Sequence, residues 1–205
     1  GVSIHSVLRD YMQAVQSKQE SSMTELLKRN WSPLGYDSKD HERQAYKQAE
    51  ITLAKFAAQI LQEKPDTIAI ELPFNFKLDG QLKVGGRIDR IDKLPDGRIE
   101  IIDYKTGTNV PTEKKVKEDF QLSFYALAAT EIKDGVLNKT PDDILLTLHY
   151  IEANKKFSTT RTKDDLELAK QKILIMVDEM SKSDFHCSGS IFCKNCEYKM
   201  LCSKH

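Results

Sequence analysis

The sequence predicts a mixed α/β fold, an α+β arrangement in which helices pack on a mixed sheet that begins with consecutive antiparallel strands. Two observations carry this prediction. Apolar residues recur at helical spacing in the first 62 residues and again after residue 118. Between these regions, residues 68–105 form three strand-like runs separated by the turn sequences Asp79-Gly80 and Pro95-Asp96-Gly97. The expected order is therefore helices, a three-strand meander, a helix and a strand.

The composition fits a globular domain with a substantial core. The chain has 205 residues, of which 40% are hydrophobic and 30% charged. Its longest apolar runs have strand length, well short of the roughly 20 residues of a membrane helix, so we expect no membrane association. The chain begins without methionine and without a basic, apolar leader. We therefore expect a cytoplasmic protein and a domain cut from a longer polypeptide.

Two helices are predicted before the strands. Ser3 can cap the first, in which Leu8, Met12 and Val15 share one face and which ends before Pro33. Asp37 or Ser38 can cap a second helix that runs to about residue 62. Its buried stripe is expected to comprise Ala45, Ala49, Leu53, Phe56, Ala57 and Ile60.

The strands of the meander are predicted at residues 68–78, 81–94 and 98–105. Gly85-Gly86 inside the second strand indicates a bulge or a close backbone approach. Beyond the meander, we expect a helix at 118–133, strands at 144–152 and 156–159, and a helix at 163–182.

The second turn fixes a register that brings two carboxylates together. A three-residue Pro-Asp-Gly loop pairs Leu94 with Arg98 and places Asp89 opposite Asp103. Like charges that face each other across two strands repel, and a divalent cation would neutralise them. Lys105 shares the face of Asp103 because side chains alternate along a strand. In the alternative register, a two-residue Asp96-Gly97 turn would move Asp89 to the opposite face.

The chain resembles the RecB-like branch of the PD-(D/E)xK nucleases, because five of its motifs follow one another in the order found in that family. Nuclease domains of this branch are fused to UvrD-type helicases and occur in AddAB-type repair complexes. The matching segments are Gly1-Val2-Ser3-Ile4-His5-Ser6-Val7-Leu8, Gly86-Arg87-Ile88-Asp89, Asp103-Tyr104-Lys105-Thr106-Gly107, Gln121-Leu122-Ser123-Phe124-Tyr125, and Cys193, Cys196 and Cys202 in C-x2-C-x5-C spacing. The resemblance covers nearly the whole chain.

The resemblance implies a restriction-endonuclease-like core with extra helices and a Mg²⁺- or Mn²⁺-dependent deoxyribonuclease, with exonuclease action expected. It implies a nuclease domain at residues 1–186 and a Cys-rich tail at 187–205 packed on the same domain. The expected partners are DNA and a helicase, either in the same chain or as another subunit. We expect the isolated domain to be a monomer that acts in DNA end processing and repair.

Hydrolysis of a phosphodiester requires an activated water and stabilisation of the phosphate charge, which carboxylate-bound divalent cations supply. We predict that Asp89 and Asp103 bind the metal and that Lys105 positions or helps to deprotonate the water. The resemblance adds the backbone carbonyl of Tyr104 and the imidazole of His5 as metal ligands. Without it, His5 would be a packed core residue, and the Asp-x-Lys sequence an ordinary surface hairpin.

Gln121 and Tyr125 are four residues apart and share one helix face, from which they can contact phosphate or orient the metal site. The alternative is a polar helix edge. Glu71 is a weaker candidate, because a two-residue Asp79-Gly80 turn would pair it with Ile88 and point it away from Asp89.

The four cysteines, Cys187, Cys193, Cys196 and Cys202, lie within sixteen residues near the end of the chain and predict a bound metal. In relatives of this branch, three tail cysteines and one upstream cysteine hold a [4Fe-4S] cluster. Here Cys187 replaces the upstream cysteine, or the fourth ligand lies in sequence not present. Zinc is the main alternative and disulfides are the third.

The chain has 31 basic and 31 acidic residues, and this neutrality counts mildly against autonomous DNA binding. A nuclease needs only a local cationic channel around its metal to bind DNA, if a fused helicase holds the DNA strand. The candidate DNA-binding residues are Arg87, Arg90, Lys114, Lys115 and Lys117. The three lysines can equally form a solvated loop, since acidic residues are interleaved with them.

Two other functions remain open. The first is a catalytically silent nuclease-like module that binds DNA or a partner, stabilised by its Cys-bound metal. The second is a small zinc-stabilised interaction domain in which the Asp-x-Lys match is accidental. The presence of Asp89, Asp103 and Lys105 together favours the nuclease.

Overall fold

A computed structural model describes residues 2–184 and residue 193. The chain divides into two compact units, residues 1–169 and 170–205, and the whole sheet lies in the first. The helices are α1 (Val2–Gln16), α2 (Met23–Asn30), α3 (Lys39–Glu63), α4 (Glu113–Lys117), α5 (Phe120–Glu131) and α6 (Lys163–Lys182). The strands are β1 (Asp66–Leu78), β2 (Leu82–Lys93), β3 (Ile99–Lys105), β4 (Ile144–Tyr150) and β5 (Lys155–Thr159). Short 3-10 turns at Gly135–Leu137 and Pro141–Asp143 precede β4.

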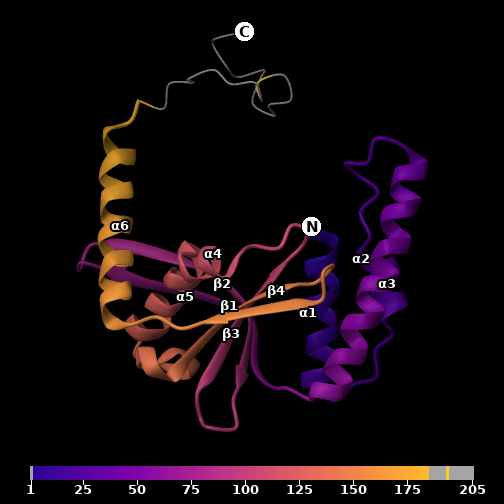
Figure 1. The fold of residues 1–205 in the computed structure, drawn as a ribbon, viewed down its shortest axis with the longest axis horizontal. Coiled ribbons are helices and arrows are strands. Elements are labelled where there is room, and N and C mark those ends of the chain that lie inside the picture. Colours follow the sequence, from indigo (N-terminus) through magenta and orange to yellow (C-terminus); the bar gives the residue numbers. More distant parts are fainter. Residues whose placement is uncertain (1, 185–192, 194–205) are drawn as a thin grey trace. The chain divides into compact units, whose positions relative to one another are not determined.

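The five strands form one mixed sheet in the order β1-β2-β3-β4-β5 (Figure 1). The first three strands are an antiparallel meander, β4 runs parallel to β3, and β5 returns antiparallel to β4. A parallel pair needs a crossover connection, and α4 and α5 supply it. The predicted mixed α/β fold is therefore confirmed.

The turn between β2 and β3 has the predicted three-residue form. Leu94 N–H donates to the carbonyl of Arg98 at 2.8 Å, and Gly97 adopts φ +92°, which suits glycine. Arg90 then pairs with Ile102 and Lys93 with Ile99. This is the register that leads toward Asp89 and Asp103, and the alternative two-residue turn is wrong.

The turn between β1 and β2 is one residue longer than expected. Leu78 pairs with Leu82 across a three-residue loop in which Asp79 and Gly80 have φ of +51° and +75°. Leu72, and not Glu71, therefore pairs with Ile88. The expectation that Glu71 pairs with Ile88 is wrong, because the sequence Asp-Gly is compatible with either loop length.

One face of the sheet is covered by α1 and α3, and the main apolar core forms there. Buried side chains of α1, α2 and α3 pack in one cluster with Ile102, Tyr104 and Ile151. The helix α5 covers the opposite face, where its residues Leu122 and Tyr125 are buried. Asp103 and Tyr104 are neighbours on β3 and therefore point to different layers of the molecule.

The helices differ from the prediction at three places. Ser3, expected to cap the first helix, lies inside α1. The region predicted as one first helix forms two helices, α1 and α2. The chain turns at Lys18, whose φ is +54°, and Ser22 then caps α2 by accepting the N–H of Glu25. The helix predicted at 118–133 is preceded by the short α4, and Asp119 caps α5. Ser38 caps α3 as predicted. Among the described residues, no helix combines the length and apolar character needed to cross a membrane.

Candidate active site

The strands β2 and β3 separate where the two predicted carboxylates lie. The pairing ends at Arg90 and Ile102, and beyond it Asp89 Oδ2 accepts the backbone N–H of Tyr104 at 2.8 Å. In a regular ladder of this register, that N–H would instead reach the carbonyl of Ile88. A carboxylate therefore takes the place of a backbone acceptor, and the strands part where Asp89 lies next to the Asp103-Tyr104-Lys105 segment.

Four polar side chains form a continuous chain of contacts beside Asp89. Lys105 Nζ lies 2.7 Å from Asp103 Oδ2, in an ion pair without hydrogen-bond geometry. Lys105 Nζ also donates to Gln121 Oε1 at 2.6 Å. Gln121 Nε2 donates to the Tyr125 hydroxyl at 2.8 Å, and that hydroxyl donates to Asp103 Oδ1 at 3.1 Å. The residues of two predicted motifs thus meet between β3 and α5.

His5 approaches the same place from the first turns of α1. Its Nδ1 lies 3.7 Å from Asp89 Oδ2, which is too long for a hydrogen bond but close for an ion pair. The imidazole is 34% exposed, so it is neither a packed core residue nor remote from solvent. Its ring also meets Tyr104 edge-on, with the ring centroids 6.4 Å apart.

The site concentrates negative charge in a partly buried place. Burial, together with the nearby carboxylates of Asp103 and Glu71, raises the pKa of Asp89 to about 6. The N–H of Tyr104 and the imidazole of His5 only partly oppose this rise. Burial, followed by the charges of Asp103 and Asp89, also raises the pKa of Tyr125. A bound cation would relieve the repulsion that these shifts report.

Glu71 joins this group of acids, although the sequence reasoning placed it elsewhere. It lies between Ile70, which pairs with Arg90, and Leu72, which pairs with Ile88, so the register sets it opposite Asp89. Its φ of +50° breaks the regular strand, and its side chain is 22% exposed. Its Oε2 lies 3.4 Å from Arg87 Nη1. The correct loop length between β1 and β2 would have identified it.

The donor atoms fit a hard divalent cation in their chemistry. The carboxylates of Asp89 and Asp103 lie close enough to perturb each other, and one oxygen of Asp103 has no hydrogen bond. Within residues 2–184 and residue 193, no three His, Cys, Asp or Glu side chains gather into a metal-binding group. Mg²⁺ is commonly held by only one or two carboxylates, with waters and substrate phosphates completing its shell. A pair of carboxylates therefore suffices for that ion.

Arg90 has a different role from the predicted one. Its side chain is 1% exposed, so it cannot reach DNA, and its assignment as a DNA-binding residue is wrong. Strand alternation turns Arg90 away from Asp89, and Asp92, two residues further, shares its face and pairs with it at 2.5 Å.

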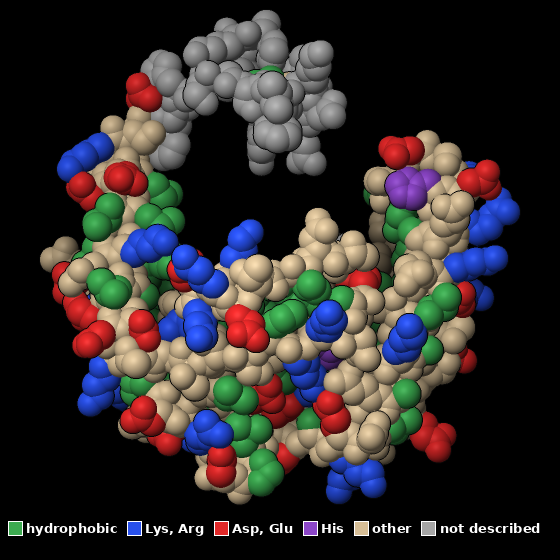
Figure 2. Space-filling model, in the orientation of Figure 1, with side chains coloured by type: hydrophobic (Ala, Val, Ile, Leu, Met, Phe, Trp, Pro, Cys, Tyr) green, Lys and Arg blue, Asp and Glu red, His purple; other side chains and the backbone are tan. Residues whose placement is uncertain are grey.

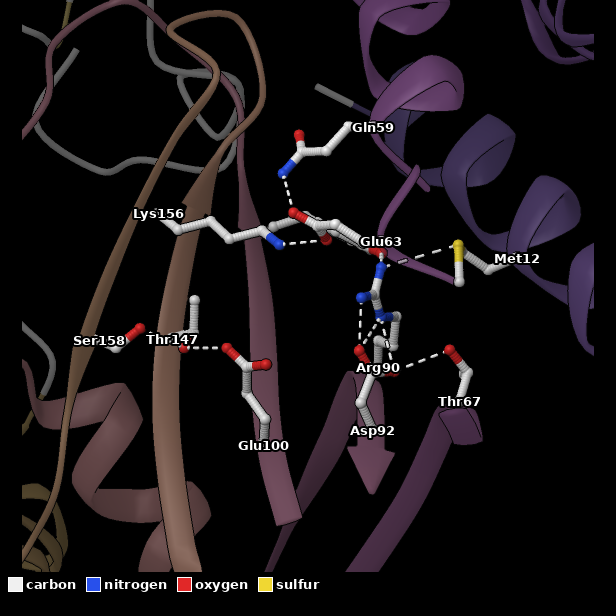
Figure 3. A network of polar contacts seen from close by, with 11 residues as sticks. Met12, Gln59, Glu63, Thr67, Arg90, Asp92, Glu100, Thr147, Lys156 and Ser158 are labelled. Atoms are coloured by element: carbon white, nitrogen blue, oxygen red, sulfur yellow. Dashed lines mark hydrogen bonds and ion pairs between the residues drawn. The ribbon is translucent and has the colours of Figure 1, made fainter. Parts of the chain in front are cut away.

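The buried Arg90 joins three elements that carry candidate site residues, and Figure 3 shows its contacts with Met12 and Asp92. Its Nη1 donates to the Tyr104 hydroxyl on β3 at 3.0 Å and contacts Met12 Sδ on α1 at 3.7 Å. Asp92 accepts a further hydrogen bond from Thr67 on β1. Met12 is two helical turns from His5 on the same face of α1. One guanidinium thus links β2, β3 and α1 beneath the site.

The remaining predicted residues lie at the surface or outside the described residues. The side chain of Arg87 is 62% exposed and that of Lys114 is 82% exposed; Lys115 and Lys117 are exposed as well. Figure 2 shows basic and acidic side chains interspersed over the face in view. Cys193 is partly exposed. The predicted ligands Cys187, Cys196 and Cys202 lie outside the described residues.

Known proteins share parts of this sequence and fold. The Gene 69 protein of Mycobacterium phage L5 is 43% identical over 95 residues, which are 46% of this chain and 27% of the phage protein. An ATP-dependent helicase/deoxyribonuclease subunit of Streptococcus agalactiae serotype Ia is 28% identical over 174 residues, which are 81% of this chain and 16% of the streptococcal protein. The chain thus spans about a quarter or less of these curated relatives.

A solved structure from Eubacterium rectale, assigned provisionally as an exonuclease, superposes with a TM-score of 0.51. It covers 87% of this chain and 66% of its own, and at 15% identity the likeness concerns the fold. The sequence profile of one nuclease family matches residues 1–203. That match spans the meander, the opposed carboxylates and the helix α5 that contacts them, and it shows that the chain belongs to the PD-(D/E)XK nuclease superfamily.

Proposed function

We propose that this chain is the nuclease domain of a helicase-nuclease and hydrolyses DNA phosphodiesters with Mg²⁺ or Mn²⁺. The observation that carries the proposal is the carboxylate of Asp89 inserted between the strands beside Asp103, with the Lys105 ammonium 2.7 Å from Asp103. Buried carboxylates that repel each other and lie beside an ammonium are suited to a cation and a phosphate.

Asp89 and Asp103 would hold the divalent cation, and His5 and the carbonyl of Tyr104 are the further candidate ligands. When bound, the cation lowers the pKa of a water and offsets the negative charge of the phosphate. Glu71 would add a third negative charge near Asp89.

Lys105 would hold the attacking water and stabilise the charge that develops on the phosphate, since its ammonium has three donors. Gln121 accepts one of these donors and so fixes the direction of the ammonium. Tyr125 would remain protonated, because its raised pKa keeps its hydroxyl a donor to Asp103. The hydroxyl thereby leaves the other oxygen of Asp103 available to the cation.

The test is cleavage of end-labelled single- and double-stranded DNA with Mn²⁺ or Mg²⁺. We expect Asp103→Asn and Lys105→Met to lower the rate about 100-fold or more, as for the loss of one preorganised charge-stabilising group. Matched controls are Asp79→Asn and Lys83→Met, which remove the same charges from the distal β1–β2 hairpin and should leave the rate unchanged. Equal degradation by wild type and the site variants would indicate a contaminant and refute the proposal.

Exonuclease action is part of the proposal, and circular single-stranded DNA tests it. An exonuclease degrades the linear strand and spares the circle, whereas cleavage of both would indicate endonuclease action. The helicase partner and the role in DNA end processing rest on the similarity to a helicase/deoxyribonuclease. The second candidate is the silent binding module, which is favoured by the absence of three converging metal ligands in the described residues. A folded protein that binds DNA without cleaving it would support this candidate.

We also propose that the tail cysteines hold a metal, either as a [4Fe-4S] cluster or as zinc. The support is the spacing of Cys193, Cys196 and Cys202 together with the additional Cys187. An anaerobic preparation with absorbance near 400 nm and bound iron would support the cluster. A colourless protein with stoichiometric zinc would instead support the zinc site, and the absence of both metals would refute the proposal.

A further inference from the structure

A cavity of about 470 Å³ is lined by the start of α1, the chain between α2 and α3, and α3 itself. Its volume is within the range of sites that bind small organic groups. Small side chains of α3, Ala45 and Ala49, leave room in its floor. The chain between α2 and α3 forms its outer wall, where Trp31 and Tyr36 stack with their ring centroids 5.6 Å apart and their planes at 12°.

The wall is aromatic and apolar although it faces solvent. Trp31 and Tyr36 are only half-buried, and Leu34 between them in sequence is 82% exposed. The wall is also held in place. Trp31 Nε1 donates to Glu42 Oε1 at 3.3 Å, and Ser32 N–H donates to Ser3 Oγ at 3.1 Å. An ordered aromatic surface next to open space is the arrangement that stacks planar ligands.

Two parts of the cavity lining are joined directly to segments that carry candidate site residues. Ser3 and Ile4 line it, and His5 follows them in the first turns of α1. Glu152 also lines it, and its Oε2 accepts the N–H of Gly107, two residues beyond Lys105, at 2.8 Å. The cavity therefore lies next to the chain segments that carry His5 and Lys105.

We propose that this cavity is a base-stacking subsite for single-stranded DNA, in which one unpaired nucleobase packs against the aromatic wall of Trp31 and Tyr36. The inference rests on the proposed DNA substrate and adds the strand preference. A base within a duplex is stacked on both sides and cannot enter, whereas every unpaired base presents a π-face. The cavity contributes Glu152 as its one charged side chain, so recognition depends on stacking more than on phosphate contacts.

The chain carries its own probe for this subsite, because Trp31 is its single tryptophan. We would titrate the protein in EDTA, where no cleavage occurs, with an oligothymidylate, with an abasic strand of equal length and with a duplex. Fluorescence anisotropy of the labelled strands reports binding, and Trp31 emission reports stacking. We expect saturable quenching by the oligothymidylate and none by the abasic strand or the duplex.

Variants at Tyr36 separate stacking from folding. Tyr36→Leu removes the ring and should weaken oligothymidylate binding about 5- to 100-fold, as for one lost base stack, while leaving binding of the abasic strand unchanged. Tyr36→Phe keeps the ring and should bind like wild type. Tyr46→Leu, which removes a ring that meets Trp31 edge-on outside this cavity, is the matched control. Thermal unfolding would establish that each variant folds.

Binding without quenching, or equal quenching by thymidylate and abasic strands, would overturn the subsite, and so would unchanged affinity in Tyr36→Leu. These results would leave the proposed nuclease activity standing, since cleavage with Mn²⁺ is measured separately. Conversely, base-dependent quenching by a protein that cleaves nothing would support the subsite and refute the hydrolytic function.

Discussion

At the scale of single residues, the position of Asp89 depends on an exchange of hydrogen-bond acceptors. Its carboxylate takes the N–H of Tyr104, so the backbone donor stays satisfied although the ladder has ended. The carboxylate also gains a donor that partly offsets its burial. The strands can therefore separate at the candidate site without leaving an unpaired amide at this position.

Glu71 is the residue whose removal best tests the acidic cluster. Glu71→Gln keeps the size of the side chain and removes a charge that raises the pKa of Asp89. We expect weaker divalent-cation binding and a several-fold higher Mn²⁺ concentration for half-maximal cleavage, because less negative charge attracts the ion. Glu50→Gln on the exposed side of α3 is the control. An unchanged Mn²⁺ requirement would show that Glu71 lies outside the metal's field.

His149 makes the fold sensitive to acid. Burial, with smaller contributions from Lys156 and Arg90, lowers its pKa to about 3, and its Nδ1 is buried without a hydrogen-bond partner in the described part of the chain. Between about pH 6.5 and pH 3, His149 is protonated in the unfolded chain but neutral in the folded chain. Stability is therefore complete above pH 6.5 and falls as the pH decreases through this interval.

We expect wild type to lose about 2 kcal/mol more than His149→Phe between pH 7 and pH 5, from the shift in pKa. Phenylalanine does not titrate, and it suits a site between the rings of Phe56 and Tyr104. Urea unfolding at both pH values measures the difference. His41→Gln, at an exposed position, should retain the wild-type dependence. Equal losses in wild type and His149→Phe would contradict the assignment.

At the scale of elements, the buried pair of Arg90 and Asp92 couples stability to the geometry of the site. Arg90→Met alone would leave Asp92 buried and unpaired, at a cost of about 3–5 kcal/mol. The double variant Arg90→Met, Asp92→Leu should recover most of that stability. Its cleavage rate should stay low, because the Tyr104 hydroxyl loses its donor and the polar link through Arg90 from β3 to Met12 of α1 is lost. Urea unfolding measures the stability of the double variant, and steady-state kinetics measure its cleavage rate. Full recovery of both stability and cleavage rate would show that the pair has a purely structural role.

Gly86 marks a second element-scale constraint, the packing of β2 against β1 and α5. A Cβ on Gly86 would lie 2.9 Å from the ring of Phe74, whose centroid is 6.1 Å from that of Tyr125 in the candidate site. Gly86→Ala should destabilise the fold by about 1–3 kcal/mol through overpacking and lower activity through Tyr125. Phe74→Leu in the same chain shortens the obstructing ring and should restore part of the loss. Additive losses in the double variant would show that the ring is not the cause.

The meander shows which parts of the fold the sequence determines by itself. The Pro95-Asp96-Gly97 loop was predictable because proline and glycine each restrict φ at a defined position. Asp79-Gly80 left the loop length open, and this error misplaced Glu71. The burial of Arg90 was accessible from alternation, which sets it opposite to Asp89 and beside Asp92. The insertion of the Asp89 carboxylate between the strands could not be predicted from alternation, because it depends on where the two strands separate.

At the scale of the whole molecule, equal numbers of basic and acidic residues set a limit on DNA binding. The formal net charge is zero, so attraction to DNA has to come from local cations. The described structure leaves Arg87 of β2 and the three lysines of α4, Lys114, Lys115 and Lys117, exposed. If all four contact phosphates of a single strand, the slope of log affinity against log salt should be about −3.

Replacing the three lysines of α4, Lys114, Lys115 and Lys117, with glutamine should reduce that slope by about 2, because each lost phosphate contact in a single strand removes about 0.7. The measurement is the anisotropy of a labelled oligonucleotide in EDTA between about 50 and 200 mM salt. A control with the same change in net charge replaces the exposed Lys47, Lys55 and Lys77. If the control lowers the slope equally, DNA responds to the total charge and α4 is a solvated helix. If only the α4 variant does so, the lysines of α4 guide the strand, and a neutral chain can still present local cations to DNA.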